Sequence, residues 1–147
     1  MSLALERLQQ DLNAARKAQD KHRLMLLGMV LSEVGNRRIE LRRDPTGEEV
    51  IEVVRRAIKR RRESVEIYEK AGRNELAEKE SAEIRMLEEY LPPAVPEEEI
   101  RSAIREAISA GATSIGAVMG KVVPLFKGRT DGSIVSAMAR EELSRTQ

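Results

Sequence analysis

The chain has 147 residues, a formal net charge of +1 and no cysteine, and 35% of its residues are charged. A net charge this close to zero argues against strong nucleic-acid binding and against a surface that attracts acidic substrates electrostatically. The lack of cysteine excludes disulfides, thiolate metal sites and cysteine nucleophiles. Aromatic residues make up only 2%, and the abundant Ala, Leu, Glu, Arg and Lys all favour helix. The length predicts one domain, or two small ones that share a core.

No apolar run approaches the roughly 18 residues that a membrane span needs. The first residues lack the pattern of a signal peptide. We therefore expect a soluble protein in the cytoplasm.

Apolar residues recur at helical spacing along the chain, and no stretch reads as a strand. This pattern predicts an all-α fold with helices at about 3–18, 20–41, 46–71, 74–91, 96–110, 114–126 and 131–144. Four of these helices begin at residues that can cap an N-terminus: Thr46 with Glu49 in capping-box spacing, and Asn74, Ser114 and Asp131.

Prolines divide the chain into two parts. Pro92 and Pro93 end the fourth helix, and Pro96 suits the first turn of the fifth. We expect a larger N-terminal helical domain at residues 1–92 and a small C-terminal domain of three helices at residues 93–147. Pro124 lies inside the sixth helix, where it removes a backbone hydrogen bond and predicts a bend.

Arg61 is a charge in an apolar stripe. It lies in the middle of the apolar sector of the third helix, and Glu80 and Glu83 fall in or beside the stripe of the fourth. A tight turn should pair these two helices as an antiparallel hairpin. Because a buried charge is tolerated mainly when it is paired, we expect Arg61 to form a buried ion pair with Glu80 or Glu83. The pair either sets the register of the hairpin or offers a positive group in a groove between the two parts.

The segment GKVVPLFKGRTDGS, residues 120–133, reads as a helix end, a basic turn and a new helix start. Lys127 and Arg129 suit the negative end of a helix dipole, and Gly128 suits a left-handed helix closure. These are structural roles. The alternative is RNA contact, in which Lys121, Lys127 and Arg129 meet phosphates beside the N-terminus of the last helix.

No arrangement of residues indicates catalysis. The chain lacks a GxSxG, P-loop, dinucleotide-binding or HExxH motif. The single histidine, His22, is a lone imidazole without a nearby acid or serine arrangement for catalysis, and we expect it at the surface. We identify no catalytic residue, no metal site and no cofactor.

Three stretches resemble the YqeY-like proteins, which share a domain with the tail of the B subunit of glutamine-dependent aminoacyl-tRNA amidotransferases. The opening LERLQQDLNAARKAQDKHRLMLLGMVLSEV is similar to the first two helices of that family. RRRESVEIYEKAGRNELAEKESAEIRMLEEYLP resembles its middle signature, and GAVMGKVVPLFKGRTDGSIV resembles the C-terminal segment shared with the amidotransferase tail. The resemblance implies an all-helical protein with a large N-terminal and a small C-terminal part.

The resemblance also implies a class of partner. In the amidotransferase the tail holds tRNA while other subunits perform the chemistry. We therefore expect a non-catalytic accessory protein that binds tRNA or a tRNA-linked amidotransferase-type complex, with weak, phosphate-led contacts. The alternative is a helical protein-interaction module without an RNA role. A third hypothesis that the family resemblance implies is carbon–nitrogen ligase activity with glutamine as amido donor. Nothing in the chain resembles the kinase-like catalytic core or the amidase signature of the enzyme.

Overall fold

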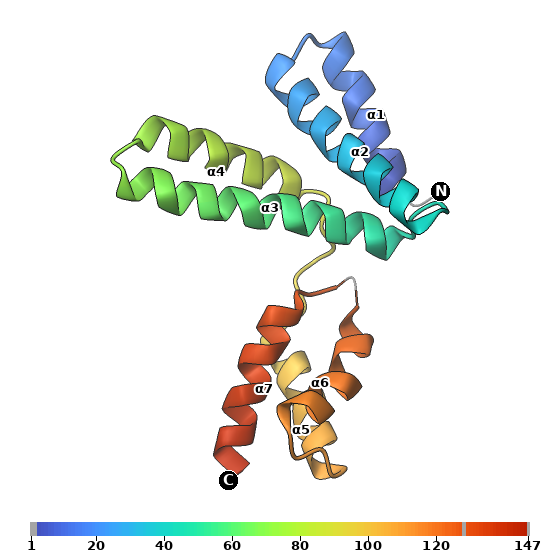
Figure 1. The fold of residues 1–147 in the computed structure, drawn as a ribbon, viewed down its shortest axis with the longest axis vertical. Coiled ribbons are helices and arrows are strands. Elements are labelled where there is room, and N and C mark those ends of the chain that lie inside the picture. Colours follow the sequence, from blue (N-terminus) through green and yellow to red (C-terminus); the bar gives the residue numbers. More distant parts are fainter. Residues whose placement is uncertain (1–2, 128, 147) are drawn as a thin grey trace. The chain divides into compact units, whose positions relative to one another are not determined.

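A computed structural model of the chain describes residues 3–127 and 129–146, and all regular structure in these ranges is helical. The all-α prediction is confirmed. The elements, in chain order, are α1 Leu3–Lys17, α2 Lys21–Leu41, α3 Gly47–Lys70, α4 Asn74–Glu88, α5 Glu97–Ser109, α6 Ile115–Val122, the 3₁₀ helix η1 Val123–Phe126 and α7 Gly132–Thr146 (Figure 1).

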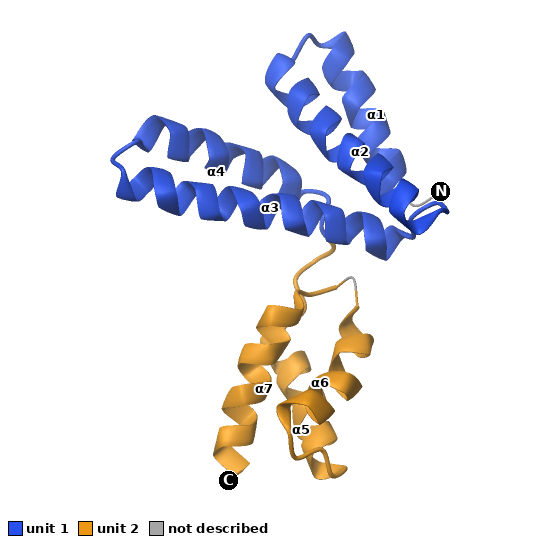
Figure 2. Ribbon diagram, in the orientation of Figure 1, with its two compact units in different colours: residues 1–91 blue, residues 92–147 orange. Residues whose placement is uncertain are grey.

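The chain forms two compact units, residues 1–91 and 92–147, which we call unit 1 and unit 2 (Figure 2). Each unit has its own apolar core, so each is described by itself. The core of unit 1 includes Leu8, Leu26, Leu27, Val30, Val34, Val50, Val54, Ile58, Ile84, Leu87 and Tyr90. The core of unit 2 includes Ile100, Ile104, Ala107, Val118, Val122, Phe126, Val135 and Ala139.

Unit 1 consists of two helical hairpins, α1–α2 and α3–α4, and both helices of the first contact α3. Tyr90 joins the two ends of this unit. Its ring is buried, and its hydroxyl donates a hydrogen bond to Asp11 of α1. Burial and this carboxylate raise the pKa of Tyr90 well above its usual range. The end of α4 is therefore tied to α1.

The predicted capping box at the start of α3 is present. The Glu49 backbone N–H donates to Thr46 Oγ1 at 3.2 Å, and the Thr46 backbone N–H donates to Glu49 Oε1 at 2.9 Å. The prediction that Asn74 caps α4 is wrong, because Asn74 is already helical and Arg73 occupies the cap position without a side-chain cap. Gly72, at φ 72°, reverses the chain in fewer residues than we expected. The helix therefore begins one residue earlier, at Asn74.

Unit 2 packs α5, α6 and α7 around one core. The sixth helix was expected to continue to Phe126, but its α-helical part ends at Val122 and continues as the 3₁₀ turn η1. Pro124 explains the change, because a proline has no N–H for the α-helical hydrogen bond and its ring excludes the carbonyl four residues earlier. The tighter turn lets Phe126 reach the core, where it is 4% exposed.

Candidate functional site

The basic turn of unit 2 is a short, well-bonded connection between η1 and α7. The Phe126 carbonyl accepts hydrogen bonds from the backbone N–H groups of Arg129 at 2.8 Å and Thr130 at 3.2 Å. The side chain of Asp131 accepts from the Ser133 N–H at 3.0 Å, as predicted for a helix cap. Gly128, which we expected to close the helix, lies outside the described residues. The turn therefore has structural hydrogen bonds on both sides of its basic residues.

All three cations predicted to meet RNA are exposed. Lys121 lies in the last turn of α6, Lys127 follows η1, and Arg129 lies in the turn before α7. Arg129 is tethered, because its Nη2 lies 3.3 Å from Glu99 Oε1 and its guanidinium lies 5.7 Å from the centre of the Phe126 ring. Its side chain is still 49% exposed. Arg129 thus holds the turn against α5 while it keeps an accessible charged edge.

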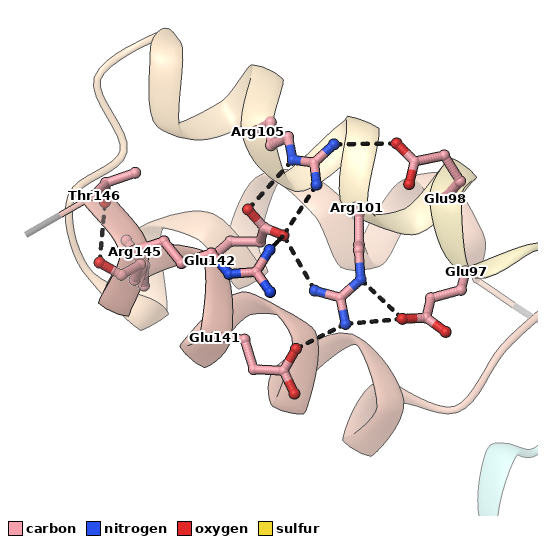
Figure 3. A network of polar contacts seen from close by, with 9 residues as sticks. Glu97, Glu98, Arg101, Arg105, Glu141, Glu142, Arg145 and Thr146 are labelled. Atoms are coloured by element: carbon pink, nitrogen blue, oxygen red, sulfur yellow. Dashed lines mark hydrogen bonds and ion pairs between the residues drawn. The ribbon is translucent and has the colours of Figure 1, made fainter.

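A second polar cluster in unit 2 surrounds Glu142 of α7 (Figure 3). Glu142 has a side chain only 5% exposed, and Arg101 Nη1, Arg105 Nε and Arg145 Nη1 lie 3.1, 3.3 and 3.4 Å from its oxygens. Hydrogen bonding from Arg105 is the largest of several causes that lower the pKa of Glu142, and hydrogen bonding from Arg101 acts in the same direction. Glu142 therefore stays ionised and joins α7 to α5.

The Glu142 cluster is not an anion site. The same arginines also contact Glu97, Glu98 and Glu141, at distances of 2.7 to 3.0 Å. The cluster thus holds three cations and four carboxylates, and little positive charge is left for a phosphate. Our sequence reasoning missed it, although Glu142 follows Val135 and Ala139 at helical spacing in the buried stripe of α7.

Arg61 of unit 1 is 8% exposed. Its Nε lies 3.4 Å from Glu83 Oε2, and its Nη1 donates to the Ala57 carbonyl at 2.9 Å. The structure thus places Glu83, and not Glu80, beside Arg61. The expectation that His22 has no acid nearby is wrong, because His22 Nε2 lies 3.2 Å from Glu83 Oε1. One carboxylate of α4 therefore contacts side chains from both α2 and α3.

The polar groups around Glu83 have a structural role. Both oxygens of the carboxylate contact groups of the same unit. Within residues 3–127 and 129–146, no group of three or more His, Asp or Glu side chains is placed to hold a metal ion. None of the described helices is both long and apolar enough to cross a membrane.

Comparison with known families settles the relationship of the chain. The model of the YqeY-like protein family matches residues 5–143. The chain belongs to the YqeY-like family. The match covers both units, so the predicted family resemblance is confirmed.

Relatives of this YqeY-like chain occur in fungi. "Altered inheritance of mitochondria protein 41, mitochondrial" of Pyrenophora tritici-repentis is 31% identical over 146 residues, which cover 95% of this chain and 81% of the relative. Proteins of the same name are 31% identical in Eremothecium gossypii and 37% identical in Kluyveromyces lactis. Those two matches cover 65% and 62% of this chain, and 54% and 51% of the relatives. The names of these relatives describe them as mitochondrial and do not support our cytoplasmic expectation.

Proposed function

We propose that this YqeY-like chain is a non-catalytic accessory protein that holds tRNA, or a tRNA-linked amidotransferase-type complex, through the basic turn of unit 2. The exposure of Lys127 and Arg129 in the turn, and of Lys121 in the last turn of α6, carries the proposal. The resemblance of residues 120–133 to the tRNA-holding tail of the amidotransferase supports it. A cytoplasmic location is part of the proposal, and cell fractionation checks it.

The local charges predict weak binding. Glu99 pairs with Arg129, and Asp131 adds a second negative charge beside the basic residues of the turn. With three phosphate contacts, the logarithm of the binding constant should fall with the logarithm of salt concentration at a slope of roughly −2 to −3. The scarcity of aromatic side chains argues against base stacking, so contacts to phosphate and RNA shape dominate.

Replacement of Lys127 and Arg129 by alanine tests the turn. We expect the double variant to lose most of its affinity for bulk tRNA, and the salt slope to flatten by about 2, because two phosphate contacts are removed. Melting temperature should change little, since cations near a helix end and exposed ion pairs such as Arg129–Glu99 each contribute only about 1 kcal/mol or less. The measurement is tRNA binding at two salt concentrations together with thermal unfolding.

The matched control is the double variant Lys79→Ala, Arg85→Ala in α4 of unit 1. It removes the same charge from exposed positions, so nonspecific attraction falls equally in both variants. If the two variants lose the same affinity, or a folded turn variant loses none, the basic turn is not the RNA contact.

Exposed apolar side chains beside the turn favour a second candidate, a protein-interaction module. Leu125 of η1 is 61% exposed and Ile134 of α7 is 45% exposed. For this candidate, replacing both by serine abolishes partner binding and leaves tRNA affinity unchanged. For the ligase reading, amide formation from glutamine, ATP and misacylated tRNA by the purified protein is the test, and we expect none.

A further inference from the structure

The outward face of α2 carries a row of uncharged side chains, Met25, Met29, Ser32, Asn36 and Ile39, which we call the α2 seam. Met25, Met29 and Ile39 are 67%, 48% and 75% exposed. Ser32 and Asn36 are exposed as well. Because 35% of the chain is charged, an exposed helix face with five successive uncharged positions differs from the rest of this surface.

The spacing of the α2 seam is that of a helix-packing surface. Its residues follow one another at intervals of four, three, four and three, the a and d spacing with which one helix packs along another. Asn36 occupies an a position, where a polar Asn sets the register of paired helices. At 1.5 Å per residue the seam is about 21 Å long, which matches a partner helix of about four turns.

Two glycines border the α2 seam on one side. Gly28 and Gly35 lie one helical position before Met29 and Asn36. A Cβ added at either glycine would meet no atom within 4 Å, so packing inside the chain does not require glycine there. Glycine inside a helix is destabilising relative to alanine. The missing side chains would let a second helix approach closely, because the distance between packed helices depends on the side chains at the contact.

Charge distinguishes the two flanks of the α2 seam. On one flank the acids are neutralised within unit 1, since Glu33 pairs with Arg60 at 2.5 Å and Glu40 pairs with Arg37 at 3.2 Å. The other flank repeats every seven residues as Lys21, Gly28 and Gly35, and Arg42 follows at the C-terminal cap of α2. Neither Lys21 nor Arg42 forms an ion pair with another described residue. This flank is therefore positive at both ends.

We propose that the α2 seam docks an acidic amphipathic helix of a partner protein. Apolar side chains of that helix pack on Met25, Met29 and Ile39, and its carboxylates face Lys21 and Arg42. The site lies in unit 1, so it does not depend on the proposed RNA contact of unit 2.

A second copy of this chain fits the α2 seam less well. In an antiparallel pair of helices the same flanks face each other, so Lys21 and Arg42 of the two copies would repel. In a parallel pair Gly28 and Gly35 would face Glu33 and Glu40, and no new ion pair would form. A different helix that carries carboxylates opposite Lys21 and Arg42 would neutralise both cations.

Synthetic peptides test the α2 seam on the full-length chain. The probe is a fluorescent 21-residue helical peptide with Leu at its a and d positions and Glu at its e and g positions. A matched peptide carries Lys in place of Glu. We expect the acidic peptide to bind at least tenfold tighter than the basic one, measured by fluorescence anisotropy. Equal binding of the two peptides, or no binding of either, overturns the proposal.

Variants then locate the contact. Met25→Ser with Ile39→Ser should weaken binding of the acidic peptide at least tenfold without lowering the melting temperature, because both side chains are largely exposed. The control Ile67→Ser removes a side chain that is 65% exposed on α3, and it should bind as the parent does. Sedimentation would overturn the proposal if the parent chain is a dimer, the variant Met25→Ser with Ile39→Ser is a monomer, and neither binds the peptide. A second copy of this chain would then occupy the α2 seam.

A glycine variant gives a readout that a purely structural role cannot produce. Gly28→Ala with Gly35→Ala should raise the melting temperature, because alanine favours helix, and should weaken peptide binding by keeping the partner helix at a distance. Affinity that is unchanged or rises with stability contradicts the docking geometry. Affinity for tRNA should be unaffected by every α2 variant, which separates this test from that of the proposed function.

Discussion

At the residue scale, Glu83 shows how one side chain can join three helices. Its two oxygens contact His22 of α2 and Arg61 of α3, and the carboxylate is 13% exposed. A charge that is this buried is costly unless it is paired. The contacts that pair it also fix how α4 lies against the other two helices.

Arg61→Ala should lower the free energy of unfolding by about 3 kcal/mol. This value lies at the lower end of the roughly 3–5 kcal/mol that breaking a buried ion pair costs, because His22 still contacts the carboxylate. Chemical denaturation followed by circular dichroism measures it. The control Arg62→Ala removes a side chain that is 63% exposed and 3.5 Å from Glu88, and it should cost less than about 1 kcal/mol. Equal losses in the two variants would mean that burial of Arg61 adds nothing.

Glu142 makes the folding stability of the chain depend on pH in the acid range. Its folded-state pKa lies below the ordinary value of 4.5, so its contribution is complete above that pH and is lost as pH falls through the folded pKa. Glu142→Gln should lower the melting temperature at pH 7 and make its decrease below about pH 4.5 shallower. Melting curves between pH 2 and pH 7 measure both effects. The exposed Glu106 of α5 is the control, and Glu106→Gln should leave the curve of melting temperature against pH almost unchanged.

At the element scale, the helix ends show which local interactions hold the chain in place. Arg43 and the capping box around Thr46 hold the pKa of Glu49 at about 2. Arg43 contributes most, through a hydrogen bond at 2.7 Å. The start of α3 is therefore bonded to the residues that follow α2, so the connection between the hairpins is well defined.

Arg42 ends α2 in a left-handed conformation, with φ 59°. A residue with a Cβ is disfavoured there, and glycine is the usual choice. Arg42→Gly should therefore raise the free energy of unfolding by up to about 1 kcal/mol. Lys59→Gly, at an exposed position inside α3, should lower it by about 1 kcal/mol. Denaturant unfolding of both variants measures this contrast, and a destabilised Arg42→Gly would show that the arginine side chain contributes more than its backbone conformation costs.

At the scale of the whole molecule, the separate cores of the two units predict independent folding. We expect a fragment of residues 1–92 to unfold cooperatively with a helical circular dichroism spectrum, because Tyr90, Leu87 and Ile84 close its core from within. Thermal unfolding of the fragment and of the full chain provides the measurement. A fragment without cooperative unfolding would mean that unit 2 completes the core of unit 1.

Residue patterns alone predicted the helices and most of their ends. Thr46, Ser114 and Asp131 cap helices as predicted, because a cap needs only residues within one turn of each other. Helical spacing likewise placed Arg61 in a buried stripe. Asn74 was wrongly predicted as a cap because the chain reverses at Gly72 in a left-handed conformation, which leaves no periodic signal in the sequence.

The side-chain contacts between different helices became visible only in the folded structure. Helical spacing left Glu80 and Glu83 as equal partners for Arg61, and it gave no reason to bring His22 from α2 to Glu83. Arg105 and Arg101 contact Glu142 from 37 and 41 residues away in the sequence, whereas Arg145 is only three residues away. The physical reason is that periodicity specifies the direction of a side chain around its own helix, whereas contacts between helices depend on how those helices pack.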